Sequence, residues 1–501
     1  MNVAMNIEPR FLLSELLVDF AVIETDMQVS GLALNSAEVR SGDVFFALPG
    51  AQCHGMAFAK EAINKGAVAV VYDPDGVSID DVDNGQLTDQ IAIPSLAEKL
   101  SEIAARFYGH PATKLQVIGI TGTNGKTSCS QFLAQALSDC GIIGTLGWGR
   151  WGGLKPTINT TPDAITLQKL LAELVSLKQK HVAMEVSSHG LAQGRVNGIN
   201  FNAAILTNIS RDHLDYHGSM QAYVAVKMQL LKTPGLQYVV LNLDDQYSES
   251  LITEISESVE IIGVSKRGRK LQRAEVLHAD NIVCKDDGVH FELVWQQQRI
   301  QVAVLVYGEF NVDNLLIVLA VMLGNGIALE KAVERVRLIR PIPGRMESFQ
   351  FGKGAARVFI DYAHTPDALK NVLISARAYS QKKLWLVFGC GGNRDQGKRA
   401  LMGSIAEQYA DQIIITDDNP RSENAEVIVS DILSGCTNKS IEIIHEREMA
   451  IRTAIQQAGP GDCVVIAGKG HETYQEIAGD RVYFSDRKLL KEMILAYRDK
   501  L

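Results

Sequence analysis

A glycine-rich loop between an apolar run and a helical stretch constrains this chain more than any other feature. Val117, Ile118 and Ile120 form a short apolar run rich in β-branched side chains, which is typical of a buried parallel strand. Gly122 and Gly125 then allow a tight turn, and Lys126 and Thr127 open a helical stretch. Strand, glycine loop and helix together predict a phosphate-binding loop, in which backbone N–H groups face the phosphates and the threonine hydroxyl holds Mg²⁺.

The loop is shorter than an ordinary P-loop. An ordinary P-loop has four residues between its first glycine and the Gly-Lys pair, and the position that would hold that first glycine is Ile120. Only two residues separate Gly122 from Gly125, so the motif is Gly-x-x-Gly-Lys-Thr. The alternative is a glycine turn that opens a surface helix, but a Lys-Thr pair directly after an apolar strand favours a phosphate site.

Length, charge and cysteine content exclude several classes of protein. At 501 residues the chain is too long for one core, and about three domains are expected. The net charge of −9 argues against a nucleic-acid partner, and the longest apolar run, residues 315–323, is too short to cross a membrane. Seven scattered cysteines without a CxxC pair indicate a reducing compartment. We therefore expect a cytoplasmic monomer that binds small molecules.

Alternating strand and helix patterns predict an α/β fold with three domains. These are a small α/β domain over residues 1–98, a central P-loop-type domain over 99–338 with a mostly parallel sheet flanked by helices, and a C-terminal Rossmann-like α/β domain over 339–501. The expected strands are 43–49, 67–72, 116–121, 182–186, 203–208, 238–243, 358–360, 384–388, 412–415 and 464–466, with an antiparallel edge within 260–306 and helices at 58–65, 96–107, 311–323 and 329–336.

Polar side chains follow many of these strands at their carboxyl ends, where ligands bind in open parallel sheets. Glu185 follows one strand, and its carboxylate suits Mg²⁺, with helix capping as the alternative. Ser210, Asp212 and His213 follow another; capping remains an alternative for the first two, and His213 is a candidate metal ligand. Four C-terminal strands end in the polar or glycine-rich strings 361–366, 389–395, 416–421 and 467–472, which predict a second ligand-binding domain.

Seven motifs follow one another in the order seen in the Mur ligase family. They are Gly122-Thr-Asn-Gly-Lys-Thr127, Glu185-Val-Ser-Ser-His-Gly190, Asp212-His-Leu-Asp-Tyr-His-Gly218, Gly308-Glu-Phe-Asn311 with Asn314, Gly344-Arg-Met-Glu347, Asp361-Tyr-Ala-His-Thr-Pro366 and Asp418-Asn-Pro-Arg421. The chain resembles this family over essentially its whole length, and it is most similar to the members that add meso-diaminopimelate.

The resemblance implies an ATP-dependent amide ligase of peptidoglycan synthesis with Mg²⁺ as cofactor. ATP would phosphorylate the γ-carboxylate of UDP-N-acetylmuramoyl-L-alanyl-D-glutamate, and the amine of meso-diaminopimelate would attack the acyl phosphate. A folylpolyglutamate synthetase-like ligase shares the short loop, but the first domain and the loops at 389–395 and 418–421 argue against it. A nucleotide-binding regulatory protein without turnover is the other alternative; it requires a damaged site, and the family's phosphate and metal positions are intact.

The resemblance also implies roles for individual residues. The ATP-binding positions are Gly122, Thr123, Asn124, Gly125, Lys126, Thr127, Ser128, Asn311, Arg345 and Asp361. The catalytic positions are Lys126, Glu185, His213 and Lys227, and the magnesium positions are Thr127, Glu185, His213 and Lys227. Lys227 falls where the family carries a carbamylated lysine, although the sequence alone makes it a helix-surface lysine.

Two further groups complete the implied site. The UDP-substrate positions are Leu34, Ser36, Ala51, Gln52, Cys53, Asn159, Thr160, Thr161, Ser187, Gln193 and Arg195, and the chain departs from the common family pattern at Asn35, Ala37 and His54. The diaminopimelate positions are Arg394, Asp418, Asn419, Pro420, Arg421, Gly468 and Glu472. Arg421 is expected to bind the distal carboxylate, because a guanidinium matches a carboxylate bidentately; the alternative is a pair with Asp417 or Asp418.

Overall fold

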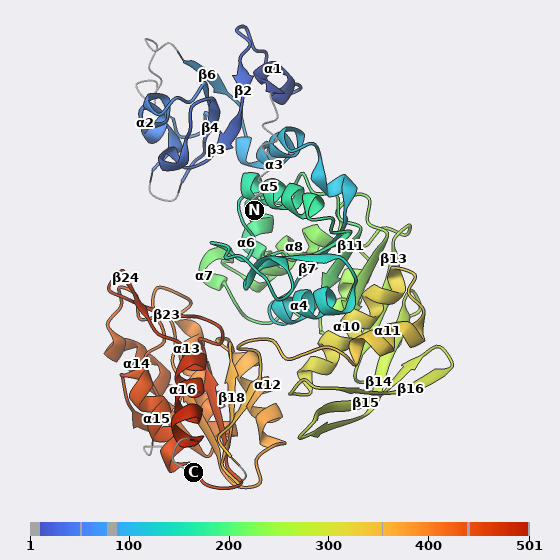
Figure 1. The fold of residues 1–501 in the computed structure, drawn as a ribbon, viewed down its shortest axis with the longest axis vertical. Helices are drawn as coiled ribbons and strands as arrows, with labels where there is room; N and C mark the ends of the chain where they lie inside the picture. Colours follow the sequence, from blue (N-terminus) through green and yellow to red (C-terminus); the bar gives the residue numbers. More distant parts are fainter. Residues whose placement is uncertain (1–10, 51–52, 78–87, 353, 438–440, 499–501) are drawn as a thin grey trace. The chain divides into compact units, whose positions relative to one another are not determined.

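The computed structural model describes residues 11–50, 53–77, 88–352, 354–437 and 441–498. The chain divides into two compact units. Figure 1 shows its helices and strands. The first comprises Met1–Gly119, Ser138–Ala203 and Thr233–Leu236, and the second comprises Ile120–Leu137, Ala204–Lys232 and Gln237–Leu501. This division does not follow the three predicted domain ranges, 1–98, 99–338 and 339–501, which stay predictions.

A four-stranded parallel sheet forms the N-terminal part of the first unit. Its order is β3 (Gly31–Ala33), β4 (Asp43–Ala47), β5 (Ala69–Tyr72) and β6 (Asp89–Ala92). Side chains alternate between the faces of a strand, so Val44 and Phe46 pack in a core with α3 (Leu96–Phe107), whereas Phe45 and Ala47 pack with α2 (Ala59–Asn64). A short hairpin-like pair, β1 (Phe11–Leu12) and β2 (Gln28–Val29), flanks α1 (Leu13–Leu16).

The rest of the first unit carries a second group of strands. β8 (Cys140–Gly144) pairs in parallel with β10 (His181–Glu185) and antiparallel with β9 (Gly147–Arg150). Helices α5 (Ala164–Ser176) and α6 (Ser188–Ala192) belong to the same unit. Strand β7 (Gln116–Thr121) begins in the first unit and ends in the second.

The second unit begins at the glycine loop. Its first strands are β11 (Ala203–Leu206), β12 (Tyr238–Asn242), β13 (Glu260–Ser265), β14 (Glu275–Lys285), β15 (Gly288–Trp295) and β16 (Gln298–Val304), and its helices here are α4 (Lys126–Ala136), α7 (Leu214–His217), α8 (Met220–Leu231), α9 (Ser248–Ile252), α10 (Phe310–Gly324) and α11 (Leu329–Val336). β14, β15 and β16 form the predicted antiparallel edge, but β13, which also lies within 260–306, is parallel to both its neighbours. The apolar helix α10 packs against α4, β12 and β13.

The C-terminal part of the second unit is a six-stranded sheet of order β17-β18-β22-β19-β20-β21. The strands are β17 (Glu347–Gln350), β18 (Arg357–Asp361), β19 (Leu384–Phe388), β20 (Gln412–Ile415), β21 (Glu442–Ile443) and β22 (Cys463–Ala467). Only the pair β17–β18 is antiparallel. One face packs against α12 (Pro366–Arg377), α13 (Gly397–Tyr409) and α14 (Ala425–Leu433), and the other against α15 (Arg447–Gln457) and α16 (Asp486–Arg498). This layering confirms the predicted α/β fold class, a mostly parallel sheet with helices on both faces, for this part of the chain.

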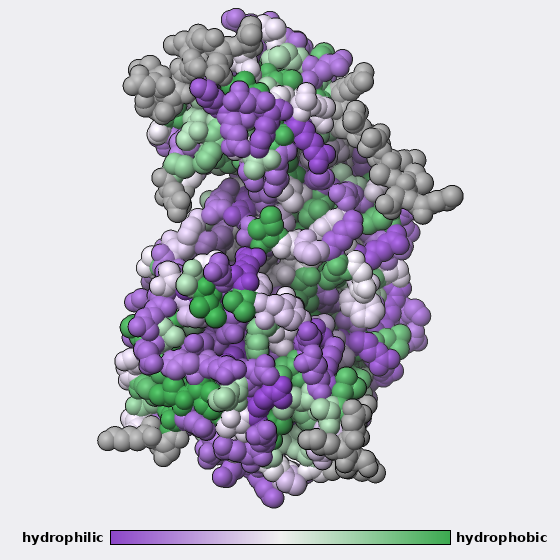
Figure 2. Space-filling model, turned by 60° about the vertical axis from the view of Figure 1, so that its left-hand side comes forward, coloured by the Kyte–Doolittle hydropathy of each residue, from purple (hydrophilic) through white to green (hydrophobic). Residues whose placement is uncertain are grey.

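A small antiparallel hairpin, β23 (Tyr474–Ile477) with β24 (Asp480–Tyr483), follows β22 and was not predicted. Ile477 forms an isolated bridge with Arg421. No helix within the described ranges is long and apolar enough to span a membrane. On the face drawn in Figure 2, hydrophilic residues are widespread and apolar residues form smaller separate groups.

Candidate active site

Two glycines give the phosphate loop its shape. Gly122 has φ +142°, and a Cβ there would lie 1.9 Å from Thr207 Oγ1. Gly125 is the N-cap of α4 with φ +86°, and a Cβ there would lie 2.7 Å from Asn314 Oδ1. The loop therefore leads directly into α4 and passes close to Thr207, just beyond the end of β11. The N-terminus of a helix is a favourable place for an anion.

Polar side chains beyond β11 hold this loop in place. Asn208 Oδ1 accepts a hydrogen bond from the Asn124 N–H at 2.9 Å, and Asn208 Nδ2 donates to the Asn124 carbonyl at 3.1 Å. Thr123 Oγ1 accepts from the Ser210 N–H at 2.9 Å and lies 3.1 Å from the Tyr223 hydroxyl. The polar residues that follow β11 thus hold the loop in place by hydrogen bonds, and Ser210 does not act as a helix cap.

Two lysines meet at one carbonyl of the loop. Lys126 Nζ donates to the carbonyls of Gly122 at 2.7 Å and Thr123 at 2.9 Å, and Lys227 Nζ donates to the Gly122 carbonyl at 2.9 Å. Lys227 is only 1% exposed and lies over the Tyr223 ring, so it is not the helix-surface lysine that the sequence alone predicts. Burial and repulsion by Lys126 hold the pKa of Lys227 well below its usual range, which favours the neutral, nucleophilic amine.

Asp212 and His213 lie in the same region, on the loop before α7. His213 Nε2 is 3.4 Å from Asp212 Oδ2, and neither side chain caps α7, whose N-cap residue is His213 itself. Burial opposes ionisation of Asp212, but the charges of His213, His364, Lys398 and Lys126 hold its pKa below the usual value. Burial and the charge of Lys398 lower the pKa of His364 to about 4, so its imidazole is neutral at neutral pH.

The residues that the resemblance assigns to adenine, ribose and phosphates are each fixed by hydrogen bonds. Arg345 Nη2 donates to Thr127 Oγ1 at 3.2 Å, and its guanidinium lies 4.4 Å from the centroid of the Tyr362 ring. Asp361 accepts from the Met346 and Ala363 N–H groups at 2.7 and 2.8 Å, and burial raises its pKa to about 6. Asn311 Nδ2 donates to the Tyr307 carbonyl at 2.7 Å. Ser128 is buried in α4.

In the first unit, Glu185 and the predicted muramyl-dipeptide positions form one network. The fully buried Glu185 carboxylate accepts from the Thr145 N–H at 3.0 Å and the Thr145 hydroxyl at 2.9 Å, and Thr145 Oγ1 lies 3.0 Å from Thr160 Oγ1. Thr161 Oγ1 donates to the Glu185 carbonyl and accepts from the Ser187 N–H. Helix capping does not explain Glu185, because Ser187 is the residue that caps α6.

The remaining positions of that group lie around the same network or on the N-terminal sheet. Arg195 donates to the Thr161 carbonyl at 2.6 Å and to Gln193 Oε1 at 2.9 Å, whereas Asn159 is exposed. Leu34, Ser36 and Cys53 follow the carboxyl ends of the adjacent parallel strands β3 and β4. The Ser36 hydroxyl donates to Glu61 at 2.7 Å, and Cys53 is exposed. Ala51 and Gln52 lie outside the described residues.

The predicted amino-acid pocket is a network of internal charge pairs. The fully buried Lys469 donates to Glu472 Oε2 at 2.8 Å and Asn419 Oδ1 at 3.0 Å, and Asn419 Nδ2 donates to Glu472 Oε2 at 3.0 Å. Gly468 has φ +111°, and a Cβ there would lie 2.3 Å from Asp418 Oδ2. Burial raises the pKa of Asp418, against the opposing charge of Lys469. Asp418, Asn419, Glu472 and Gly468 are therefore brought together.

Arg421 belongs to the same pocket but pairs with an unpredicted residue. Its Nε donates to Glu476 Oε2 at 3.2 Å and its Nη1 donates to the Gly392 carbonyl at 2.7 Å. The alternative pair with Asp417 or Asp418 is wrong, since Asp417 instead accepts from His445 at 2.8 Å and Asp418 faces Lys469. Pro420, beside Arg421, is buried, and the other candidate arginine, Arg394, is exposed.

Sequence reasoning missed several side chains that shape these sites. Arg399 is fully buried on α13, where it donates to Asp431 and Glu423 at 2.8 Å and to the Gly391 carbonyl at 3.3 Å. Lys398, its neighbour, is 7% exposed and affects the pKa of both Asp212 and His364. The only signal for these residues was the Lys-Arg pair directly after a glycine-rich string, which also fits an exposed helix start.

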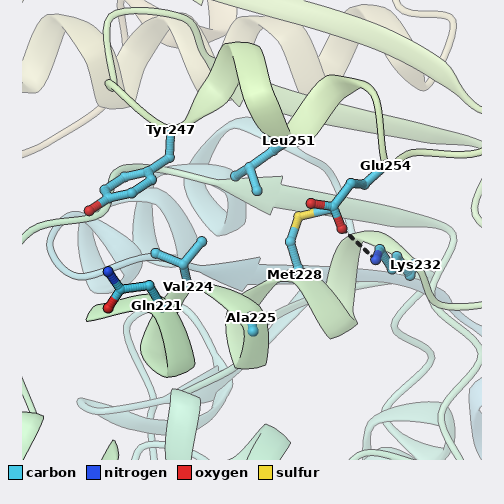
Figure 3. Close-up of a pocket in the computed structure, with 8 residues that line it drawn as sticks. All are labelled: Gln221, Val224, Ala225, Met228, Lys232, Tyr247, Leu251 and Glu254. Carbon is cyan, nitrogen blue, oxygen red and sulfur yellow. Dashed lines mark hydrogen bonds and ion pairs between the residues drawn. The ribbon is translucent and has the colours of Figure 1, made fainter. Parts of the chain in front are cut away.

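A pocket lies between α8 and the segment that contains α9 (Figure 3). It has a volume of about 320 Å³ and is lined by Gln221, Val224, Ala225, Met228, Lys232, Tyr247, Leu251 and Glu254. Lys232 and Glu254 form an ion pair of 2.6 Å at one side of it. None of the predicted site residues lines this pocket, so the pocket does not mark the proposed chemistry.

Three family models match most of the chain. Residues 28–108 match the model described as Mur ligase family, catalytic domain; residues 120–322 match the Mur ligase middle domain; and residues 344–470 match the Mur ligase, glutamate ligase domain. Two relatives are named UDP-N-acetylmuramoyl-L-alanyl-D-glutamate–2,6-diaminopimelate ligase. The protein from Alkalilimnicola ehrlichii is 42% identical over 94% of this chain and 95% of its own, and that from Coxiella burnetii is 42% identical over 94% and 97%.

Solved structures agree with this assignment. A structure of a UDP-N-acetylmuramoyl-L-alanyl-D-glutamate–2,6-diaminopimelate ligase has a TM-score of 0.68 and 34% identity, and the match covers 98% of this chain and 99% of that one. The folylpolyglutamate synthase of Mycobacterium tuberculosis has a TM-score of 0.61 and 17% identity over 74% of this chain and 91% of its own, which shows a common fold alone.

Proposed function

The chain belongs to the Mur ligase family, and we propose on that basis that it adds meso-diaminopimelate to UDP-N-acetylmuramoyl-L-alanyl-D-glutamate in the cytoplasm, at the expense of ATP, in peptidoglycan biosynthesis. The observation that carries the proposal is the meeting of Lys126 and Lys227 at the Gly122 carbonyl, within a chain that matches named ligases over nearly its full length. Positive charge beside a glycine loop is what a triphosphate requires.

The reaction has two steps. The γ-carboxylate of the D-glutamyl residue attacks the γ-phosphorus of ATP and ADP leaves; the amine of diaminopimelate then attacks the acyl carbon and phosphate leaves. Lys126 neutralises charge on the transferring phosphoryl group, and Arg345, beside Thr127, adds a second cation. Asn311, Asp361 and Ser128 are proposed to complete the ATP site together with loop residues 122–127.

Magnesium fits the donor set that the family positions supply. The Thr127 hydroxyl and the Glu185 carboxylate offer the oxygen ligands that Mg²⁺ prefers, and this cation also keeps several waters and binds substrate phosphates. Thr127, Glu185 and His213 would hold it together with Lys227 if that amine is carbamylated. When bound, Mg²⁺ supplies charge stabilisation to the phosphates.

The chain's own contribution to that modification is the state of Lys227. A buried lysine with a lowered pKa is a neutral amine, which reacts with CO₂, whereas an ammonium does not. The carbamate that results places anionic oxygen beside the phosphate loop, where the unmodified side chain is neutral.

The other substrates are assigned to the strand-end loops. We propose that Leu34, Ser36, Ala51, Gln52 and Cys53 contact the uridine nucleotide and that Asn159, Thr160, Thr161, Ser187, Gln193 and Arg195 contact the muramyl dipeptide. The separate family matches at 28–108, 120–322 and 344–470 support three domains near the ranges 1–98, 99–338 and 339–501. A monomeric state stays a prediction.

The diaminopimelate site is proposed at the C-terminal strand ends. Arg421 would bind the distal carboxylate, with Arg394 as second candidate, Glu472 would bind the distal ammonium, and Asp418 would line the pocket. Asn419, Pro420 and Gly468 would shape the pocket. Support comes from the close grouping of these loops and from the arginine that reaches between Gly392 and the β23 strand.

The deciding experiment measures phosphate release from ATP with the UDP-muramyl dipeptide and meso-diaminopimelate, lysine or no amino acid. We expect release with diaminopimelate and product formation confirmed by mass spectrometry. Equal turnover with lysine would contradict the amino-acid assignment. Turnover with a folate and glutamate would favour the folylpolyglutamate synthetase-like alternative, and ATP binding without any release would favour a regulatory protein.

A further inference from the structure

The hairpin β23–β24 holds Arg421 through both backbone and side chain. The Arg421 N–H donates to the Glu476 carbonyl at 2.8 Å, and the Ala478 N–H donates to the Arg421 carbonyl at 2.7 Å. Arg421 itself has φ +54°, an unusual value for a side-chain-bearing residue, which the two flanking bonds maintain. The side chain of Glu476 is therefore fixed relative to the guanidinium that it contacts.

The Arg421–Glu476 pair is open to a ligand, unlike its neighbours. The side chains of Arg421 and Glu476 are 21% and 30% exposed, whereas Lys469 beside them is fully buried. Glu472 is held by Lys469 and Asn419, and Asn419 Oδ1 also accepts from the Glu476 N–H at 3.0 Å. The backbone at Glu476 is thus anchored, and its carboxylate is the most accessible anion beside the arginine among these residues.

We propose that Glu476 is a specificity-determining residue whose carboxylate competes with the distal carboxylate of the amino-acid substrate for Arg421. This inference rests on the proposed function. Glu476 accepts a hydrogen bond from Arg421 Nε, and the Gly392 carbonyl accepts one from Nη1. An incoming carboxylate therefore binds an arginine whose charge is already balanced by Glu476. Two carboxylates at one guanidinium repel each other, so the glutamate keeps Arg421 extended but weakens its hold on substrate.

A ligand without a distal carboxylate does not enter this competition. Lysine would leave the Arg421–Glu476 pair in place, whereas diaminopimelate must loosen or share it. The side chain at position 476 therefore sets the affinity for diaminopimelate without touching the phosphate loop, and it acts on KM rather than on kcat.

The test is steady-state kinetics of the full-length enzyme with Glu476→Gln, which removes the charge and keeps a hydrogen-bond acceptor for Arg421. We expect the KM for meso-diaminopimelate to fall by about two- to fivefold, the range of a partly exposed charge pair, with kcat and the KM for ATP unchanged. Any turnover with lysine should keep its KM. Glu476→Ala, which also removes the acceptor, should lose part of this gain.

A matched control is Glu448→Gln, because Glu448 pairs with Arg452 at 2.7 Å on the exposed side of α15 and should leave all constants unchanged. An unchanged or raised KM for diaminopimelate in Glu476→Gln would overturn the inference. An equal rise of this KM in Glu476→Gln and Glu476→Ala would mean that the glutamate only orients Arg421. If the wild-type enzyme does not use diaminopimelate, the proposed function fails instead, so the two failures are distinguishable.

Discussion

The phosphate loop and the amino-acid pocket treat positive charge in opposite ways. At the loop, Lys126 and Lys227 donate to neutral backbone carbonyls, and the charge of Lys126 adds to burial in lowering the pKa of Lys227. In the pocket, Lys469 and Arg421 contact carboxylates of the protein, Glu472 and Glu476.

This difference matches the charges of the proposed ligands. A triphosphate is a polyanion, and the Lys126 ammonium beside the glycine loop favours its binding. An amino acid with an ammonium and a carboxylate at its far end is a zwitterion, and a pocket of balanced pairs accepts it by exchanging partners with little change in net charge. The loop should therefore control rate, and the pocket should control selectivity.

The largest expected effect is at the loop. Lys126→Ala should lower kcat by about 10²–10³-fold, because a cation on the transferring phosphoryl group is removed from the transition state. Phosphate release measures the loss, and circular dichroism checks that the fold is intact. Lys232→Ala, an exposed lysine at the end of α8, is the control and should be close to wild type. Near-normal phosphate release by a folded Lys126→Ala variant would show that this lysine does not take part in phosphoryl transfer.

Lys227→Ala should have the next largest effect. Its activity should fall by about a hundredfold, as expected for removal of a metal-supporting group. The wild-type enzyme should weaken when bicarbonate is depleted and recover when it is restored. Because the pKa of Lys227 is lowered in the folded protein, its amine is neutral above that lowered value, and carbamylation should fall as pH drops through it. Native mass spectrometry that shows only unmodified lysine in a fully active enzyme would contradict this prediction.

In the pocket, Arg421→Ala should raise the KM for diaminopimelate by roughly 30-fold, the lower end expected for a lost arginine–carboxylate contact, since the side chain is partly exposed. The KM values for ATP and the UDP substrate should stay unchanged, which distinguishes a substitution in the pocket from one in the phosphate loop. Arg452→Ala, a surface arginine of α15, serves as control. A kcat loss with unchanged KM would break the division between rate and selectivity.

The smallest effect concerns the ion pair that supports the pocket loop. His445 Nδ1 donates to Asp417 at 2.8 Å, which raises the pKa of His445. The folded-state pKa is above the unfolded one, so the stabilisation is complete below about pH 6.5 and is lost as pH rises through the raised value. His445→Gln should lower the free energy of unfolding by about 0.5 kcal/mol at pH 6 and hardly at pH 9, because the side chain is 36% exposed. Thermal denaturation at the two pH values measures this, and a larger loss at pH 9 would contradict it.

Local patterns were enough to predict much of the fold. Helices α3 and α11 and strands β7, β19 and β20 have the bounds that the sequence predicts. Where an apolar run ends in glycine or polar residues, the local sequence is enough to locate the end of the element, because burial and turn chemistry act between near neighbours. The hairpin β23–β24 was missed, since its residues alternate weakly and are largely exposed.

The sequence by itself determined the glycine loop, the order of strands and helices, and the strand-end positions where ligands are expected. Only the tertiary structure decided that Lys227 is buried against Gly122, 105 positions away in the chain, and that Arg421 pairs with Glu476, 55 positions away. The physical reason is range: strand, turn and helix signals arise within a few residues, whereas the partner and pKa of a charged side chain depend on elements that meet only after the chain has folded.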